Sequence, residues 1–271
     1  MVRSLWTAAT GMVAQQTNVD TIANNLANVN TNGYKTQVNE FKSLLYQEIQ
    51  TKTTSANGEA KPSSAQVGLG VRNASITSVF SQGSLIASEN DTAFAIDGKG
   101  FFAVRGEDGN TYYTRNGNFK FTLATNGNML ATSEGLPVLD TNGRAIVLDD
   151  NYVLSRIVVS NDGSLNYPDA ENNLKPLGIK IGLFQFNNPN GLDKLSDSLY
   201  QVTAASGQAL NEATNNAVEK SDVIQRYLEG SNVQVVDEMV NMIVAQRAYE
   251  LNSKAITASD EMLQQANNLR R

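Results

Sequence analysis

Large apolar residues recur at a helical spacing near the start of the chain. A first set is spaced every seven residues: Leu5, Met12, Val19 and Leu26. Ile22 and Val29 fall on the adjoining stripe, and polar residues lie opposite. An apolar stripe with this period is typical of an amphipathic helix. The pattern predicts a helix from Ser4 to about Asn30.

The end of the chain repeats this design. A second set of residues is also seven apart: Leu228, Val235, Met242, Tyr249, Ile256 and Leu263. Met239 widens the stripe. Ser231 and Gln234 have the spacing of a capping box. We therefore expect a long helix from about Asn232 to about Leu269. Because a lone amphipathic helix cannot bury its stripe in water, the two terminal helices are expected to pair.

The middle of the chain, residues 71–200, has a different sequence pattern. Short apolar runs alternate with Gly, Asn and Asp, and Asn-Gly or Asp-Gly turns recur about every ten residues. Such turns between strand-like runs are typical of antiparallel sheets. The polar stretches 47–66 and 202–221 lack an apolar stripe and are interpreted as connectors. The sequence thus predicts an α+β fold with terminal helices and a central antiparallel β-rich domain.

The amino-acid composition of the chain argues against several classes of function. The chain has no Cys and no His, which removes disulfides, thiolate chemistry, Cys/His zinc sites and imidazole catalysis. A net charge of −6 without a basic cluster argues against nucleic acid and anionic membrane surfaces. No apolar run is long enough to span a bilayer. No basic start leads into an apolar stretch with a cleavage site, so we expect no cleaved secretion signal.

A carbohydrate-active β-domain stays open as an alternative, because acids cluster at Glu107–Gly109 and Leu148–Asp150 and two carboxyls suffice for glycoside hydrolysis. Asp162, Asp169 and Glu171 could bind calcium, but they lack the spacing of an EF-hand or a nonapeptide repeat, and no metal or cofactor is predicted.

Two motifs in the middle have a functional and a structural interpretation. "GKGFF", with Gly98, Gly100, Phe101 and Phe102, resembles a phosphate loop only weakly, because no GxxxxGK[ST] pattern or helix follows it. The alternative is a turn entering a strand that buries one phenylalanine. "YTRNGNF" could place Tyr113 and Arg115 in a carboxylate or sugar site. A hairpin bending at Gly117, with Tyr113 and Phe119 in the core, is favoured.

The two ends also resemble a known family. "ANNLANVNTNGYK" and "EGSNVQVVDEMVNMIVAQRAYELNSKAITASDEML" resemble the terminal motifs of bacterial flagellar rod and hook proteins. "AIDGKGFFAV", "YTRNGNF" and "SQGSL" match inside the chain, so the resemblance covers nearly its whole length. Within the family the ends are most similar to distal-rod members. Proximal-rod or hook paralogues remain the alternative.

This resemblance implies a structural subunit without a catalytic site that polymerises into a tube. It implies that residues 1–32 and 222–271 form an inner coiled-coil domain. Residues 33–70 and 201–221 would be connectors, with a distal-rod-type extra stretch at 47–66, and residues 71–200 would be the outer domain. The implied partners are other copies, proximal rod and hook proteins, the surrounding ring proteins and the flagellar type III export apparatus. The implied location is the basal body, reached with an uncleaved N-terminus.

Candidate site residues follow from the same patterns. Those expected to pack within and between subunits are Leu5, Met12, Val19, Ile22, Leu26, Val29, Val235, Met239, Met242, Tyr249, Ile256 and Leu263. Asn24, Asn25 and Asn28 are expected to form amide hydrogen bonds between packed helices. Gly33 is the expected helix stop. "FKSLL", with Phe41, Leu44 and Leu45, is similar to the motif by which early substrates engage the export gate. Its alternative is a core-facing amphipathic turn.

Overall fold

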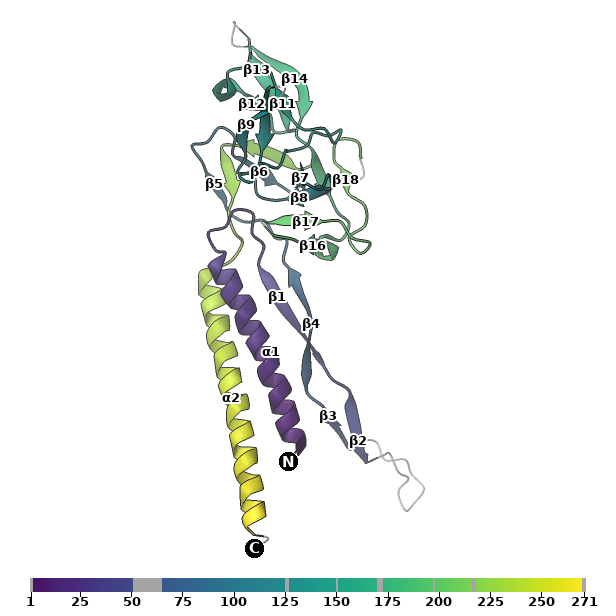
Figure 1. The fold of residues 1–271 in the computed structure, drawn as a ribbon, viewed down its shortest axis with the longest axis vertical. Coiled ribbons are helices and arrows are strands. Elements are labelled where there is room, and N and C mark those ends of the chain that lie inside the picture. Colours follow the sequence, from purple (N-terminus) through teal and green to yellow (C-terminus); the bar gives the residue numbers. More distant parts are fainter. Residues whose placement is uncertain are drawn as a thin grey trace. The chain divides into compact units, whose positions relative to one another are not determined.

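The computed structural model describes residues 2–50, 65–124, 127–149, 151–169, 173–196, 198–215 and 218–269. The chain divides into two compact units (Figure 1). The helical unit comprises Met1–Ala27, Gln37–Thr77 and Gln234–Arg271, and the β unit comprises Asn28–Thr36 and Ser78–Val233. A helix at each end and strands between them confirm the predicted α+β class.

In the helical unit, α1 (Val2–Ala27) and α2 (Val235–Asn268) lie side by side (Figure 1). Strand β1 (Gln37–Ser43) pairs with β4 (Val71–Ser78), and β2 (Tyr46–Gln50) pairs with β3 (Ala65–Gly68). The predicted connector 47–66 therefore begins and ends in paired strands. Its central part, residues 51–64, lies outside the described residues.

Both helix boundaries differ from the predicted ones. Helix α1 ends at Ala27 rather than Asn30, and α2 begins at Val235 rather than Asn232. The predicted capping box is wrong, because Gln234 is the N-cap residue and makes no side-chain cap bond. The Ser231 hydroxyl instead accepts a hydrogen bond from the Val233 amide at 3.3 Å. The Asn232 side chain binds the Thr36 amide and the Val79 carbonyl, which keeps this segment out of the helix.

The β unit is built from antiparallel pairs. Strand β5 (Leu85–Ala87) pairs with β20 (Tyr227–Glu229), and β6 (Phe94–Asp97) pairs with β19 (Asp222–Gln225). Its largest sheet has the order β16 (Asp193–Lys194), β17 (Leu199–Gln201), β8 (Thr111–Thr114), β7 (Phe101–Arg105), β15 (Leu183–Gln185) and β18 (Leu210–Asn211).

Two three-stranded sheets and two short 3-10 helices complete the unit. The first sheet is β11 (Val147–Leu148), β10 (Gly127–Ala131) and β9 (Lys120–Ala124). The second is β12 (Val158–Val159), β13 (Ser164–Pro168) and β14 (Leu174–Lys180). The 3-10 helices are η1 (Leu154–Arg156) and η2 (Pro189–Gly191).

The unit boundaries also lie elsewhere than predicted. Residues 201–221 belong to the β unit rather than to a separate connector, and residues 222–233 carry β19 and β20 rather than helix. Strand pairing explains the difference, because β19 and β20 bind β6 and β5, which come from the first half of the β unit.

The core lies on both faces of β7. Phe102 and Val104 join one buried cluster, while Phe101 and Ala103 join another with Tyr113. Successive side chains of a strand point to opposite faces, so a strand buried on both sides reads as a continuous apolar run. The prediction that only one phenylalanine of "GKGFF" is buried is therefore wrong, because Phe101 and Phe102 are 2% and 0% exposed.

Candidate functional site

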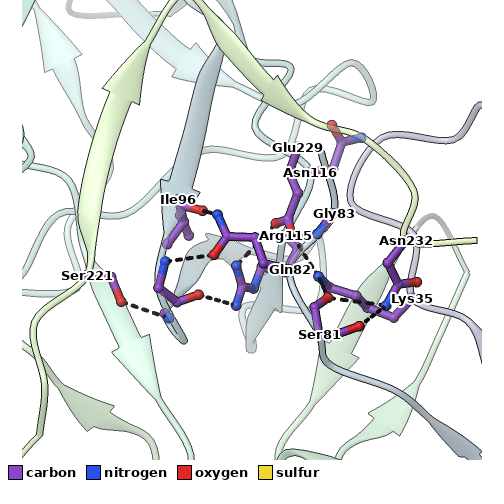
Figure 2. Close-up of polar contacts among 12 residues, drawn as sticks. Lys35, Ser81, Gln82, Gly83, Ile96, Arg115, Asn116, Ser221, Glu229 and Asn232 are labelled. Carbon is purple, nitrogen blue, oxygen red and sulfur yellow. Dashed lines mark hydrogen bonds and ion pairs between the residues drawn. The ribbon is translucent and has the colours of Figure 1, made fainter. Parts of the chain in front are cut away.

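Three charged side chains meet inside the β unit (Figure 2). Lys35 Nζ lies 2.6 Å from Glu229 Oε1, and Arg115 Nη1 lies 3.1 Å from Glu229 Oε2. The side chains of Lys35 and Glu229 are 0% exposed, and that of Arg115 is 2% exposed. We call these three residues the buried clamp.

Backbone groups make further hydrogen bonds with the clamp (Figure 2), while Arg115 Nε is buried without a partner among the described residues. Lys35 donates to the Ser81 carbonyl at 2.7 Å, and the Gly83 amide donates to Glu229 Oε1 at 3.0 Å. Arg115 Nη2 donates to the Gly98 carbonyl at 2.7 Å, and its guanidinium lies 5.2 Å from the centre of the Phe101 ring. Such a network fixes one arrangement of the segments that contribute to it.

Two cations face one carboxylate in the buried clamp. Burial lowers the pKa of Lys35, the neighbouring Glu229 raises it, and Arg115 lowers it again. Burial raises the pKa of the Tyr200 hydroxyl, which also interacts electrostatically with Arg115 and Glu229. Removing the only carboxylate would leave two buried cations, so Glu229 is the member on which the clamp depends most.

The buried clamp joins the two stretches of the β unit that are adjacent in sequence to the terminal helices. Residues 28–36 follow α1, and Glu229 is a few residues before α2. Backbone bonds run between the same stretches, because the Gly33 amide donates to the Glu229 carbonyl at 2.8 Å and the Asn232 amide donates to the Tyr34 carbonyl at 3.4 Å. The arrangement holds together chain segments that are distant in the sequence.

Asn25 makes a comparable link in the helical unit. Its Nδ2 donates to the Gln37 carbonyl at 2.8 Å, and its Oδ1 accepts from the Gln37 amide at 2.9 Å. Asn25 is 1% exposed, so this amide is used inside the chain rather than between helices of different copies. Asn24 lies 3.5 Å from the Gln37 side chain, and Asn28 accepts from the Thr31 hydroxyl at 3.1 Å.

The residues predicted to pack between helices are buried to different degrees. Ile22 is buried, and Leu5, Met12, Val19, Leu26, Val29, Met242, Ile256 and Leu263 are half-buried. Val235, Met239 and Tyr249 are exposed. Val19 and Tyr249 line a groove of about 380 Å³ together with Gln16, Gln246 and Glu250.

Small and polar residues mediate much of the contact between α1 and α2. Ala14 and Ala245 are 2% exposed, and the Ser4 and Ser259 hydroxyls lie 3.2 Å apart. Gly11 adjoins Asn252, where an added Cβ would lie 2.8 Å from Asn252 Nδ2. Small residues allow helices to approach closely, but they bury little apolar area.

A second apolar row on α2 was not predicted as a site. Val236, Val240, Val244 and Leu251 are 73%, 54%, 62% and 66% exposed. Residues four apart lie on one helix face, so the first three form a continuous row and Leu251 extends it two turns further. Their i, i+4 spacing is visible in the sequence, where it is obscured by the seven-residue pattern beside it.

The remaining predicted residues lie on strands and turns. Phe41 is in β1 and 41% exposed, while Leu44 and Leu45 follow it, with Leu45 83% exposed. Gly98 and Gly100 form the turn before β7, where the Gly100 amide donates to the Ser221 hydroxyl at 3.0 Å. Gly117 approaches the Phe94 carbonyl so closely that any Cβ would collide with it. Tyr113 packs edge to face on Phe186 at 4.9 Å.

No group of three or more potential Asp and Glu metal ligands occurs among the described residues. Asp108 is fully exposed, and a hydrogen bond from Tyr112 lowers the pKa of its carboxyl, which disfavours it as a general acid. Asp150 lies outside the described residues. Within the part that the structure describes, no helix is long and apolar enough to cross a membrane.

Comparisons with known proteins agree with this picture of a structural chain. Three family models match in chain order. "Flagella basal body rod protein" covers residues 5–35, "Flagellar hook protein FlgE/F/G D1 domain" covers residues 95–167, and "Flagellar basal body rod FlgEFG protein C-terminal" covers residues 224–269.

Full-length relatives define the family. The protein named flagellar basal-body rod protein FlgG from Borreliella burgdorferi is 42% identical over all of both chains. Proteins of the same name are 40% identical in Buchnera aphidicola, over 99% of this chain and 100% of the relative, and 36% identical in Bacillus subtilis, over all of both chains. The chain belongs to the flagellar basal-body rod protein family.

Proposed function

We propose that the chain is a structural subunit that assembles with further copies of itself into the distal part of the flagellar rod. In this role it transmits torque from the motor side of the basal body to the hook. The full-length similarity to proteins named FlgG supports this rod position over that of a proximal-rod or hook paralogue.

The observation that carries the proposal is the exposed apolar row of α2. Val236, Val240, Val244 and Leu251 are all more than half exposed in the isolated chain. Burial of each such side chain contributes about 1.5–3 kcal/mol, and a helical array repeats this gain at every subunit. An open helix requires heterologous contacts, in which the row meets a different surface of the next copy.

The terminal helices are then the inner, coiled-coil part of the tube. The half-buried stripes of α1 and α2, including Met12, Leu26 and Met242, are completed by helices of neighbouring copies. The groove beside Val19 and Tyr249 is one place where such a helix would fit.

The buried clamp supports a mechanical role. A subunit that carries torque must keep its chain segments from slipping under load. Lys35, Arg115 and Glu229 hold the stretches of the β unit that continue into both helices. The chain has no catalytic role in this account.

The wider context follows from the family. The chain is exported by the flagellar type III apparatus without cleavage of its N-terminus, and the exposed Phe41 and Leu45 are available to the export gate before assembly. Its neighbours are proximal rod proteins, hook proteins and the rings that surround the rod.

Electron microscopy of basal bodies from a strain lacking this gene tests the proposal. In this strain the rod should end before its distal section, and adding back the wild-type gene should restore the full length of the rod. A complete rod in the deletion strain would contradict the proposal. If purified chain from which both helices have been removed hydrolysed cell wall, a carbohydrate-active role would be supported instead.

A further inference from the structure

A groove of about 260 Å³ lies in the helical unit, where α1, β1 and α2 meet. Thr21 and Ile22 of α1 line it, together with Asn39 of β1 and Glu238 and Asn241 of α2. Two of these side chains, Asn39 and Glu238, are each 8% exposed. The groove is therefore bordered by a nearly buried amide and a nearly buried carboxylate.

Glu238 has no counterion among the residues that the structure describes. Its Oε2 atom is buried and has no hydrogen-bond partner, and no Lys or Arg of the described residues forms an ion pair with it. An acid in the first turn of a helix gains from the helix dipole, which favours Glu238 at this position. That gain does not replace a hydrogen-bond donor for a buried carboxylate oxygen.

Asn39 is an independent observation at the same place. Neither Nδ2 nor Oδ1 of its side chain has a partner among the described residues. Asn25, by contrast, uses both atoms of its amide on Gln37. Unsatisfied buried polar atoms are rare, so two side chains from different elements that share one groove require an explanation.

We infer that the groove receives an arginine side chain from a second copy of this chain. A guanidinium carries the charge that Glu238 lacks, and its planar fork of donors can reach a carboxylate oxygen and an amide oxygen together. Phe41 and Val244 line the same groove and are 41% and 62% exposed. They offer apolar surface for the alkyl part of the arginine. The inference rests on the proposed function, because it needs a neighbouring copy.

The structure also limits which arginines can serve as donors. Arg3 and Arg72 of the helical unit are exposed and form no ion pair among the described residues. Arg247 already binds Glu250 at 2.8 Å. Among the described arginines of the helical unit, Arg3 and Arg72 are therefore the donors that we propose, and a charge exchange identifies which one.

Polymerisation of the purified full-length chain tests the groove. Glu238→Gln should raise the critical concentration for assembly by about tenfold, the change expected when one charge-assisted contact per interface is weakened. Asn39→Asp, which adds a second carboxylate, should lower the critical concentration. Glu261→Gln is the matched control, since it removes an exposed acid of the same helix that lines neither groove, and it should leave the critical concentration unchanged.

Charge-reversal variants provide a test in which assembly is first lost and then restored. Glu238→Arg should block assembly, and combining it with Arg3→Glu or Arg72→Glu should restore assembly for one of the two. Thermal unfolding of each monomer shows whether it is folded. An unchanged critical concentration for folded Glu238→Gln would overturn the inference, as would failure of both exchanges in folded double variants.

Failure of the proposed function would give a different experimental result from failure of the arginine site. If wild-type chain forms no polymer, the rod proposal fails, and the groove is judged on the monomer by titration with ethylguanidinium. Saturating shifts of the Asn39 and Glu238 amide resonances that Glu238→Gln abolishes would support a guanidinium site. Their absence would overturn it.

Discussion

Lys35 Nζ and Glu229 Oε1 lie 2.6 Å apart, although 194 positions separate the two residues in the chain. Both side chains are fully buried. The pair connects the stretch that follows α1 with the stretch that precedes α2 inside the β unit. A buried ion pair contributes little net stability compared with an apolar pair, but removing one partner is severe. The contact therefore makes this arrangement of the β unit specific.

Glu229→Gln should lower the free energy of unfolding of the β unit by about 3–5 kcal/mol, because Lys35 and Arg115 would remain as buried cations without a counterion. Lys35→Met should be milder, since Glu229 keeps Arg115 as its partner. Urea unfolding followed by circular dichroism measures both variants.

The ion pair between Lys175 and Asp169 provides the control. Their side chains are 70% and 45% exposed. Lys175→Met should change the free energy of unfolding by less than about 1 kcal/mol, as for other exposed pairs. Equal decreases in the free energy of unfolding for Glu229→Gln and Lys175→Met would show that the buried clamp contributes no more than an exposed ion pair.

The lowered pKa of Lys35 gives the clamp a pH dependence. In the unfolded chain this lysine titrates near 10.5, and in the folded protein it titrates lower because of burial. Between the two pKa values the unfolded chain binds more protons, so the Lys35 contribution to the free energy of unfolding rises with pH. The difference in this free energy between wild type and Lys35→Met should therefore shift in favour of wild type as pH rises toward 10.5. A difference that shrinks over the same range would mean that the pKa is raised instead.

Asn24 and Asn25 are adjacent but differ in burial, which makes them a matched pair. Asn25→Ala leaves the Gln37 amide and carbonyl without their side-chain partner, and should destabilise this region by about 1–3 kcal/mol. Asn24→Ala removes an exposed side chain with a 3.5 Å contact to the Gln37 side chain, and should destabilise the region less than Asn25→Ala. Hydrogen exchange at the Gln37 amide should accelerate for Asn25→Ala alone. Similar exchange in both variants would argue against the link.

Gly33 has a positive φ of 70°, and an added Cβ would lie 2.7 Å from the Arg115 and Asn116 backbone. Gly143 has a similar φ of 75°, but nothing lies within 4 Å of the added atom. Gly143→Ala should therefore lower the free energy of unfolding by about 1–2 kcal/mol, which is the cost of a positive φ for a residue with a Cβ. Gly33→Ala adds a backbone collision and should lower the free energy of unfolding clearly more. Thermal unfolding compares the two, and equal losses would show that the close approach is unimportant.

The sequence predicts those features that depend on local patterns. The seven-residue spacing from Leu5 to Leu26 indicates α1, and the Asp162-Gly163 turn indicates the paired strands β12 and β13. Each of these signals involves neighbours within a few positions. Two local predictions are wrong. Asn116-Gly117 is not the bend of a hairpin, because β8 and β9 belong to different sheets, and Gly33 is not the helix stop, because α1 ends at Ala27.

Contacts between distant residues leave no such pattern. Nothing near Lys35 or Arg115 in the sequence indicates Glu229, and nothing near Asn25 indicates that its amide binds the Gln37 backbone. The error at Ser231 has the same origin, because Asn232 binds Thr36 and holds the segment extended. Periodicity also leaves open how strongly each apolar position of α2 is exposed, since that depends on how α1 packs.

Basal bodies carrying a single change in the exposed row test the central claim most directly. Val240→Asp, expressed in a strain that lacks the wild-type gene, places a charge in the row without disturbing a buried residue. Thr257→Asp is the control, since it adds the same charge at another exposed position of α2. Electron microscopy should show shafts that end early for Val240→Asp and complete shafts for Thr257→Asp. Complete shafts from exported Val240→Asp would contradict assembly through the α2 row.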